Sequence, residues 1–138
     1  MDEPKIVDRN PGASQAGPDP ETLRQAYLSL LKLGLTDLLG VRTQTIHWNE
    51  KGNLFLRHLK DEELRFRVNG IDWPAHGMTM VGLERLDDLQ NCVETVVRDS
   101  VKGDLIEAGT WRGGASILMR ATLNSLGAND RTVWLADS

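Results

Sequence analysis

The sequence has little cysteine and few aromatic residues, with one Cys, one Tyr and two Phe in 138 residues, and it contains no run of lysine and arginine. Cys92 alone cannot form an intrachain disulfide, which fits a reducing compartment. The net charge of −4 argues against nucleic acid or an anionic membrane as partner. No stretch approaches the ~18 apolar residues of a membrane span, and residues 1–5 are too polar for a signal peptide. We therefore expect a cytoplasmic protein.

The N-terminal third divides into a tail and a helix. Residues 1–19 are rich in proline, glycine and polar side chains, which predicts a disordered tail. Asp19 and Pro20 are typical of a helix start, and leucines at helical spacing predict a helix over 20–39, with Gly40 ending it. A Leu/Tyr stripe on this helix would suit a subunit contact, so we expect a homo-oligomer.

The stretch up to residue 78 is harder to interpret, and we assign residues 20–78 to an N-terminal helical and irregular cap region. Residues 42–48 fit a strand or a loop, and a short helix is predicted around 60–66. Trp48 and Trp73 are expected to pack this region or to line a subunit contact. The three histidines show no metal-ligand spacing, and we interpret them as surface or packing residues.

Residues 79–138 follow the pattern of the first half of an α/β domain. An amphipathic helix is predicted over 79–99, with Cys92 on its apolar side. A strand at 104–108, a helix at about 114–126 and a strand at 132–136 then form one right-handed crossover. Both strands are apolar nearly throughout, as in parallel sheets that are covered on both faces. Two strands leave such a doubly wound sheet incomplete, so we expect the chain to be the N-terminal part of a longer protein.

The turn between the first of these strands and its helix carries the clearest functional signal. Residues 103–116 read GDLIEAGTWRGGAS. Gly109, Gly113 and Gly114 would let a ligand approach the backbone, and the helix N-terminus adds N–H groups and partial positive charge. The plain alternative is a strand-to-helix turn without a ligand.

Two acidic residues narrow the choice of ligand. Glu107, just before the glycines, is awkward beside a phosphate but suits the ammonium and sulfonium groups of S-adenosylmethionine. Asp137, about 20 residues past the glycines, is placed to bind ribose hydroxyls. Arg112 could pair with a ligand carboxylate or be a solvated loop arginine, and Trp111 could flank an adenine or serve packing. A nicotinamide-dependent oxidoreductase is the competing enzyme class, and a non-catalytic binding or oligomerisation remnant is the third possibility.

With these residues in view, the chain resembles the macrocin O-methyltransferase (TylF-type) family of sugar O-methyltransferases in natural-product pathways. The resemblance is continuous over about 72–138 and patchy over 21–71. The matching segments are 27–32 (YLSLLK), 72–74 (DWP), 79–89 (TMVGLERLDDL), 92–94 (CVE), 103–115 (GDLIEAGTWRGGA) and 130–138 (DRTVWLADS).

The resemblance implies a class I methyltransferase fold, which is Rossmann-like and doubly wound. It implies S-adenosylmethionine as cofactor, magnesium in the full-length enzyme, and a sugar-bearing small molecule as acceptor. It places Thr79 and Met80 in a segment that closes over the cofactor. The other positions that it assigns to the cofactor are Glu107, Gly109, Arg112, Gly113, Gly114, Ala115, Asp137 and Ser138.

The family pattern continues past Ala-Asp-Ser into a Phe-x-Gly-Leu-Pro segment and later aspartates that bind metal and act as base. None of these later residues occurs in this sequence. The catalytic base and the metal ligands are therefore expected beyond Ser138, and the 138-residue chain alone is expected to be inactive.

Overall fold

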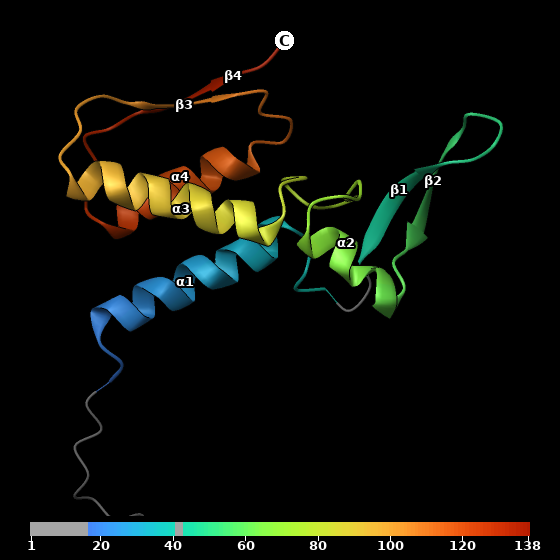
Figure 1. Cartoon of the computed structure of the whole chain (residues 1–138), viewed down its shortest axis with the longest axis horizontal. Coiled ribbons are helices and arrows are strands. Elements are labelled where there is room, and N and C mark those ends of the chain that lie inside the picture. The colour runs from blue at the N-terminus through green and yellow to red at the C-terminus, as the bar shows by residue number, and fades with distance from the viewer. Residues whose placement is uncertain (1–16, 41–42) are drawn as a thin grey trace, which may run out of the picture.

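The structure is a computed structural model, and it describes residues 17–40 and 43–138. Residues 1–16 of the predicted tail (1–19) lie outside the described residues. Helices α1 (Pro20–Leu35), α3 (Leu83–Arg98) and α4 (Gly114–Ser125) form the bulk of one half, and strands β3 (Leu105–Ala108) and β4 (Val133–Ala136) lie along them. The other half is the hairpin of β1 (Gln44–Trp48) and β2 (Leu54–His58), followed by a short 3-10 turn (Asp61–Glu63) and α2 (Leu64–Val68). Figure 1 shows the hairpin projecting to one side of the helical half.

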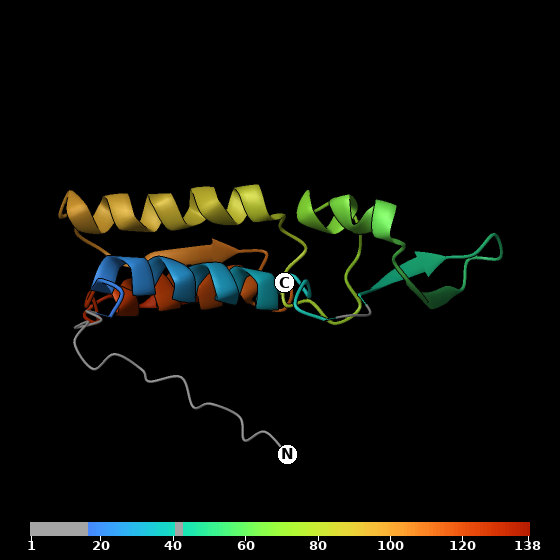
Figure 2. The same ribbon diagram turned by 90° about the horizontal axis from the view of Figure 1, so that it is seen from below.

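Strands β3 and β4 pair in parallel through the α4 crossover, with Leu105 opposite Val133 and Ala108 opposite Ala136. Helices α3 and α4 lie on one face of this pair, and α1 packs against them (Figures 1 and 2). On the opposite face Ile106 and Trp134 are 68% and 57% exposed. The predicted strand-helix-strand unit is confirmed, and within the described ranges its sheet has these two strands alone.

The core lies between the three long helices. Apolar side chains of α1, α3 and α4 meet there, so burial of apolar area stabilises the helix packing. Two adjoining clusters make up this core: Leu28, Leu35, Leu86, Leu118 and Ala121, then Val93, Met119 and Leu123. In the residues described, no helix is long and apolar enough to cross a membrane.

Both ends of the predicted first helix can be checked. The Asp19 carboxylate accepts a hydrogen bond from the Thr22 N–H at 3.0 Å, which confirms the N-cap. The helix ends at Leu35, however, and not at residue 39 before Gly40. Thr36 turns its hydroxyl back to the Lys32 carbonyl at 2.8 Å, and Asp37 adopts the left-handed conformation with φ of 58°. The turn is thus made by Thr36 and Asp37 without a glycine.

The helix predicted at 79–99 begins later, at Leu83, with Gly82 at its N-cap. Residues 78–82 are extended because Met78 and Gly82 are held by other segments. The Met78 N–H donates to the Leu35 carbonyl at 2.7 Å, and Gly82 packs so closely on 68–70 that a Cβ would lie 2.5 Å from the Asn69 carbonyl carbon. Tertiary contacts therefore delay the helix by one turn.

The prediction that Cys92 is a small core residue is wrong, because Cys92 is exposed. Its neighbours on α3, Val93 and Leu89, face the core instead. A shift of one position along a helix turns a side chain by about 100°, which is enough to move it from the core to solvent.

The cap region contains a strand that the sequence did not reveal. Within the ambiguous segment 42–48, Gln44–Trp48 form strand β1, and it pairs with β2, which was missed. The Asn49 side-chain oxygen closes the turn between them by accepting the N–H groups of Lys51 and Asn53. The short helix predicted at 60–66 begins as a 3-10 turn and continues to Val68.

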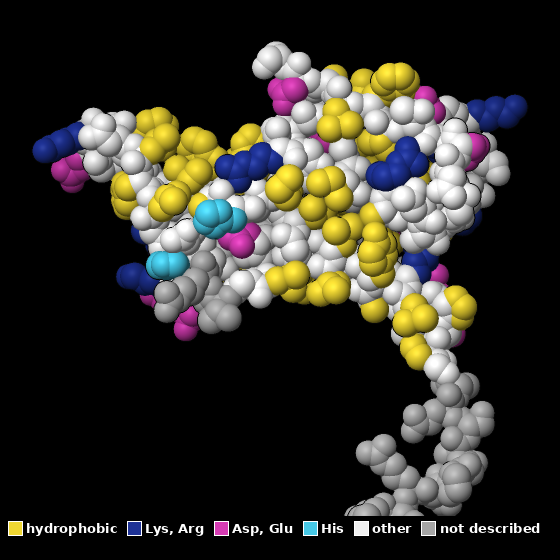
Figure 3. All heavy atoms as spheres, turned by 180° about the vertical axis from the view of Figure 1, so that it is seen from behind, with side chains coloured by type: hydrophobic (Ala, Val, Ile, Leu, Met, Phe, Trp, Pro, Cys, Tyr) yellow, Lys and Arg dark blue, Asp and Glu magenta, His cyan; other side chains and the backbone are white. Residues whose placement is uncertain are grey.

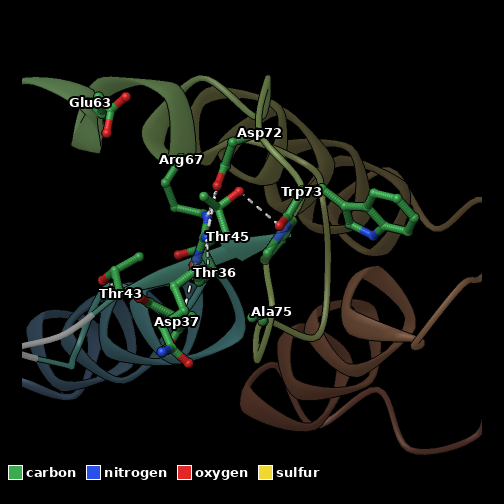
Figure 4. Close-up of polar contacts among 12 residues, drawn as sticks. Thr36, Asp37, Thr43, Thr45, Glu63, Arg67, Asp72, Trp73 and Ala75 are labelled. Carbon is green, nitrogen blue, oxygen red and sulfur yellow. Dashed lines mark hydrogen bonds and ion pairs between the residues drawn. The ribbon is translucent and has the colours of Figure 1, made fainter. Parts of the chain in front are cut away.

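Arg67 is the organising residue of the cap region, with a side chain only 2% exposed (Figure 4). Its guanidinium binds Asp72 through two nitrogens, at 2.9 and 2.8 Å. It also donates to the Thr36 carbonyl at 3.0 Å and to the Gln44 carbonyl at 2.8 Å. One cation thereby joins the end of α1, the start of β1 and the Asp72–Pro74 segment.

Replacing Arg67 by Ala is predicted to cost about 3–5 kcal/mol of unfolding free energy, because it leaves the Asp72 carboxylate buried without its partner. Urea denaturation followed by tryptophan fluorescence would measure this loss. Arg65→Ala, on the exposed side of the same short helix, is the control and should stay within about 1 kcal/mol of the parent. Equal losses in the two variants would contradict the organising role of Arg67.

Candidate functional site

The site is the glycine loop 109–113, which connects β3 to α4. Gly109 and Gly113 have φ values of 79° and 77°, and Trp111 between them has φ of 47°, so these three positions of the loop are left-handed. Glycine adopts this conformation without steric cost, whereas Trp111 must be held in it by its surroundings. The loop closes with a hydrogen bond from the Gly113 N–H to the Thr110 carbonyl at 2.7 Å.

Asp137, which directly follows β4, holds Trp111 in this conformation. Its Oδ2 accepts hydrogen bonds from the Thr110 hydroxyl and the Trp111 N–H, both at 2.9 Å, and its Oδ1 accepts one from the Ser138 N–H at 2.8 Å. These three donors, Ser138 first, lower the pKa of Asp137 below its ordinary value. The carboxylate is exposed and ionised, and it stands at the carboxyl end of the parallel strands, where ligands bind in open α/β sheets.

Glu107, in β3, turns toward the start of α4. Its Oε2 accepts a hydrogen bond from the Ser116 N–H at 2.9 Å and another from the Ser116 hydroxyl. Gly113 at the N-cap has no side chain that could do this, so Glu107 caps the helix from the sheet. A carboxylate also suits the partial positive charge of a helix N-terminus.

Gly114 is where the cap region meets the loop. Its N–H donates to the Met78 carbonyl at 2.9 Å, and a Cβ at this position would lie 2.5 Å from that oxygen and 2.7 Å from the Thr79 Cβ. Thr79 is 5% exposed and accepts the Val81 N–H, while Met80 is 45% exposed. The structure therefore brings Thr79 to the glycine loop, as expected of a closing segment, and leaves Met80 facing solvent.

Arg112 binds backbone carbonyls of the cap region, a role that was not considered from the sequence. Its Nη1 donates to the carbonyls of Ala75 and Gly77 at 2.8 and 3.0 Å and lies 3.5 Å from that of Pro74. The guanidinium also stacks on the Trp111 ring, 4.3 Å from its centroid. Arg112 thus fastens residues 74–77 to the loop, and Trp111 supports it by packing.

Three contributors were missed from the sequence: Thr110, Ser116 and Met78. Each acts through a partner far away in the chain, and Met78 acts through its backbone alone. Thr110 is 8% exposed although it lies between loop glycines, and no local pattern in the sequence marks it. Ala115 is buried behind the loop, and Ser138 contributes its N–H to Asp137.

A groove of about 550 Å³ runs along α4 from Arg112 and Gly113 to Asn124, between Tyr27 and β4. Gly109 and Asp137 are not among its lining residues, so the groove and the strand-end site are different surfaces. Within the ranges that the structure covers, no group of three or more His, Cys, Asp or Glu residues could hold a metal ion. The described His, Cys, Asp and Glu residues therefore do not fit a magnesium site.

Comparison with known proteins agrees with the resemblance. The family model for macrocin O-methyltransferase (TylF) matches residues 25–138. The 8-demethyl-8-(2,3-dimethoxy-alpha-L-rhamnosyl)-tetracenomycin-C 4'-O-methyltransferase of Streptomyces olivaceus is 47% identical over 86% of this chain and 42% of its own length. The mycinamicin III 3''-O-methyltransferase of Micromonospora griseorubida is 51% identical over 86% of this chain and 44% of its own.

A solved structure shares the fold. The O-methyltransferase NovP superposes with a TM-score of 0.66 at 38% identity, over 83% of this chain and 42% of that one. The chain therefore spans about two fifths of the length of these relatives. The family match over most of the chain and the shared architecture lead to one conclusion: the chain belongs to the macrocin O-methyltransferase (TylF) family.

Proposed function

We propose that the chain is the cofactor-binding portion of an S-adenosylmethionine-dependent O-methyltransferase that acts on a sugar hydroxyl of a natural product. Asp137 would hold the ribose hydroxyls, and the glycine loop would lie against the rest of the cofactor. The bound cofactor would supply the methyl group for transfer to the hydroxyl oxygen, with S-adenosylhomocysteine and the hydroxyl proton as the other products. Two relatives are named as methyltransferases of glycosylated tetracenomycin and mycinamicin, which supports a sugar-bearing acceptor.

The observation that carries the proposal is the position of Glu107. In dinucleotide enzymes the pyrophosphate binds at the N-terminus of the helix after the glycine loop. Here the Glu107 carboxylate occupies that place on the Ser116 N–H at 2.9 Å. A phosphate would meet a negative charge there, whereas a cofactor with cationic groups and no phosphate would not. The arrangement therefore favours S-adenosylmethionine over a nicotinamide dinucleotide.

Magnesium remains part of the proposal for the whole enzyme, on the family resemblance alone. We assign no metal ligand and no base, and we derive no step through the metal. The proposed roles of the described residues are to bind and orient the cofactor. Asp137 would accept hydrogen bonds from the ribose hydroxyls, and Glu107 would disfavour a phosphate at the helix N-terminus. Gly114 and Arg112 would hold residues 74–79 against the loop.

We also retain the proposal of a homo-oligomer. The apolar stripe on α1 stays uncovered, with Leu23, Tyr27 and Leu30 exposed at 54%, 51% and 58%. An uncovered apolar stripe of this kind supports a subunit contact. Figure 3 shows hydrophobic side chains gathered on the face of the molecule seen there.

Isothermal titration calorimetry tests the cofactor assignment. The chain is predicted to bind S-adenosylhomocysteine and not NADH. Asp137→Asn should lower the affinity for S-adenosylhomocysteine by about 10-fold or more, because charge-assisted hydrogen bonds contribute about 1.5–3 kcal/mol. Asp130→Asn, the same change in the loop before β4, is the control and should have little effect. Binding of NADH alone would overturn the assignment.

Gly114→Ala tests the contact between the cap region and the loop. The added Cβ cannot coexist with the Met78 carbonyl 2.5 Å away, so residues 78–79 must move, at an overpacking cost of about 1–3 kcal/mol. We expect a lower unfolding free energy together with weaker S-adenosylhomocysteine binding. The control is Gly34→Ala in α1, where the nearest side chain is 3.5 Å away and helix propensity favours alanine. Unchanged cofactor affinity in Gly114→Ala would show that Thr79 plays no part in binding.

A further inference from the structure

A second cavity, of about 470 Å³, lies in the cap region between β1 and the segment 66–73. Ring and branched aliphatic side chains form most of its wall: Ile46, Trp48, Leu59, Phe66, Ile71 and Trp73. The rings of Trp48 and Trp73 lie 6.2 Å apart at an angle of 38°. The volume and the aromatic wall are typical of a small-molecule site.

The charged residues of the wall are already paired. Arg57 forms two hydrogen bonds with Glu63, at 2.6 and 2.9 Å, and Asp72 is held by the buried Arg67. A charged ligand would therefore have to break an existing ion pair to enter. An uncharged ring system would meet apolar side chains and ring faces without that cost.

One polar group of the wall is unsatisfied. The Trp73 Nε1 is buried and has no hydrogen-bond partner within the described part of the chain. Buried N–H groups in proteins nearly always have an acceptor, but this atom has almost no accessible surface, so a ligand is indicated by the apolar wall and the paired charges instead.

The cavity and the glycine loop are connected through one short segment. Trp73 precedes Pro74, whose carbonyl lies 3.5 Å from the Arg112 Nη1, and Ala75 is bound by the same nitrogen. The cavity thus lies at one end of the segment 73–79 and the loop at the other. A ligand that fills the cavity can extend along this segment to the strand-end site.

We propose that this cavity binds the uncharged ring system of the acceptor and leaves the attached sugar directed toward the glycine loop. The proposal rests on the proposed function, because it deepens the identity of the acceptor. Trp48 is 60% exposed and Ile71 is 67% exposed, and both form the open mouth through which the rings enter. A second copy of the chain on the same surface is the competing occupant.

Nuclear magnetic resonance of the four tryptophan indole N–H groups tests the proposal. The probe is 4-methylumbelliferyl α-L-rhamnoside, with methyl α-L-rhamnoside as the sugar without rings. The indole N–H signals are assigned by Trp→Phe substitutions. The aryl glycoside should shift the signals of Trp48 and Trp73 and leave the signal of Trp134 unshifted. The methyl glycoside should shift none of them. Absence of a Trp48 or Trp73 shift with the aryl probe would overturn the proposal.

Trp48→Ala should lower the affinity for the aryl glycoside by at least about 5-fold, because an aromatic contact contributes about 1 kcal/mol or more. Because Trp48 is largely exposed, its removal should not unfold the chain. Trp134→Ala, equally exposed on β4, is the matched control and should bind within about 2-fold of the parent. If Trp48→Ala instead dissociates an oligomer in size-exclusion chromatography without changing glycoside affinity, the surface is a contact between copies and the proposal is wrong.

The S-adenosylhomocysteine titration separates this proposal from the proposed function. Cofactor binding without glycoside binding would refute the acceptor cavity alone. Glycoside binding without cofactor binding would refute the methyltransferase assignment and leave the cavity as an independent ring-binding site.

Discussion

The amide of Gly114 lies 2.9 Å from the Met78 carbonyl, and the cap region meets the strand-helix-strand unit at this contact. The approach is possible only because residue 114 has no Cβ. This contact buries Thr79 against Gly114, while the Met78–Leu35 hydrogen bond and the packing of Gly82 on 68–70 delay the start of α3. Arg112 reinforces the same junction by binding the carbonyls of residues 75 and 77.

Two arginines, the buried Arg67 and the stacked Arg112, hold the cap region in place. Arg67 gathers α1, β1 and Asp72 into one polar centre, and Arg112 ties the chain beyond Asp72 to the glycine loop. Arg112 donates to backbone carbonyls, and Arg67 donates to carboxylates and to two backbone carbonyls at once, which a planar guanidinium with several N–H groups does better than a lysine. The segment between them, 72–79, is therefore fixed at both ends, and it joins the proposed acceptor cavity to the proposed cofactor site.

The regular α/β part could be predicted closely from the sequence, because β3, α4 and β4 have continuous apolar strands and a glycine-marked turn. The hairpin could not, since Leu54, Phe55 and Leu56 are all exposed and the strand lacks the alternation that a half-buried strand shows. The ends of α1 and α3 depend on Thr36, Gly82 and their distant partners, which local patterns do not contain. Within the site, Asp137 was placed by its position after a strand, whereas the bond between Glu107 and Ser116 needed the fold to bring strand and helix together.

The two carboxylates at the loop have different surroundings and would do different work. Glu107 is committed to the helix N-terminus, while Asp137 is exposed and, besides its three hydrogen bonds from protein donors, retains oxygen lone pairs that can face a ligand. A crystal structure of the chain with S-adenosylhomocysteine tests this account most directly. The account predicts the ribose hydroxyls within hydrogen-bond distance of the Asp137 carboxylate and Glu107 still on Ser116. Ribose bound elsewhere, with Asp137 contacting only Thr110, Trp111 and Ser138, would contradict it.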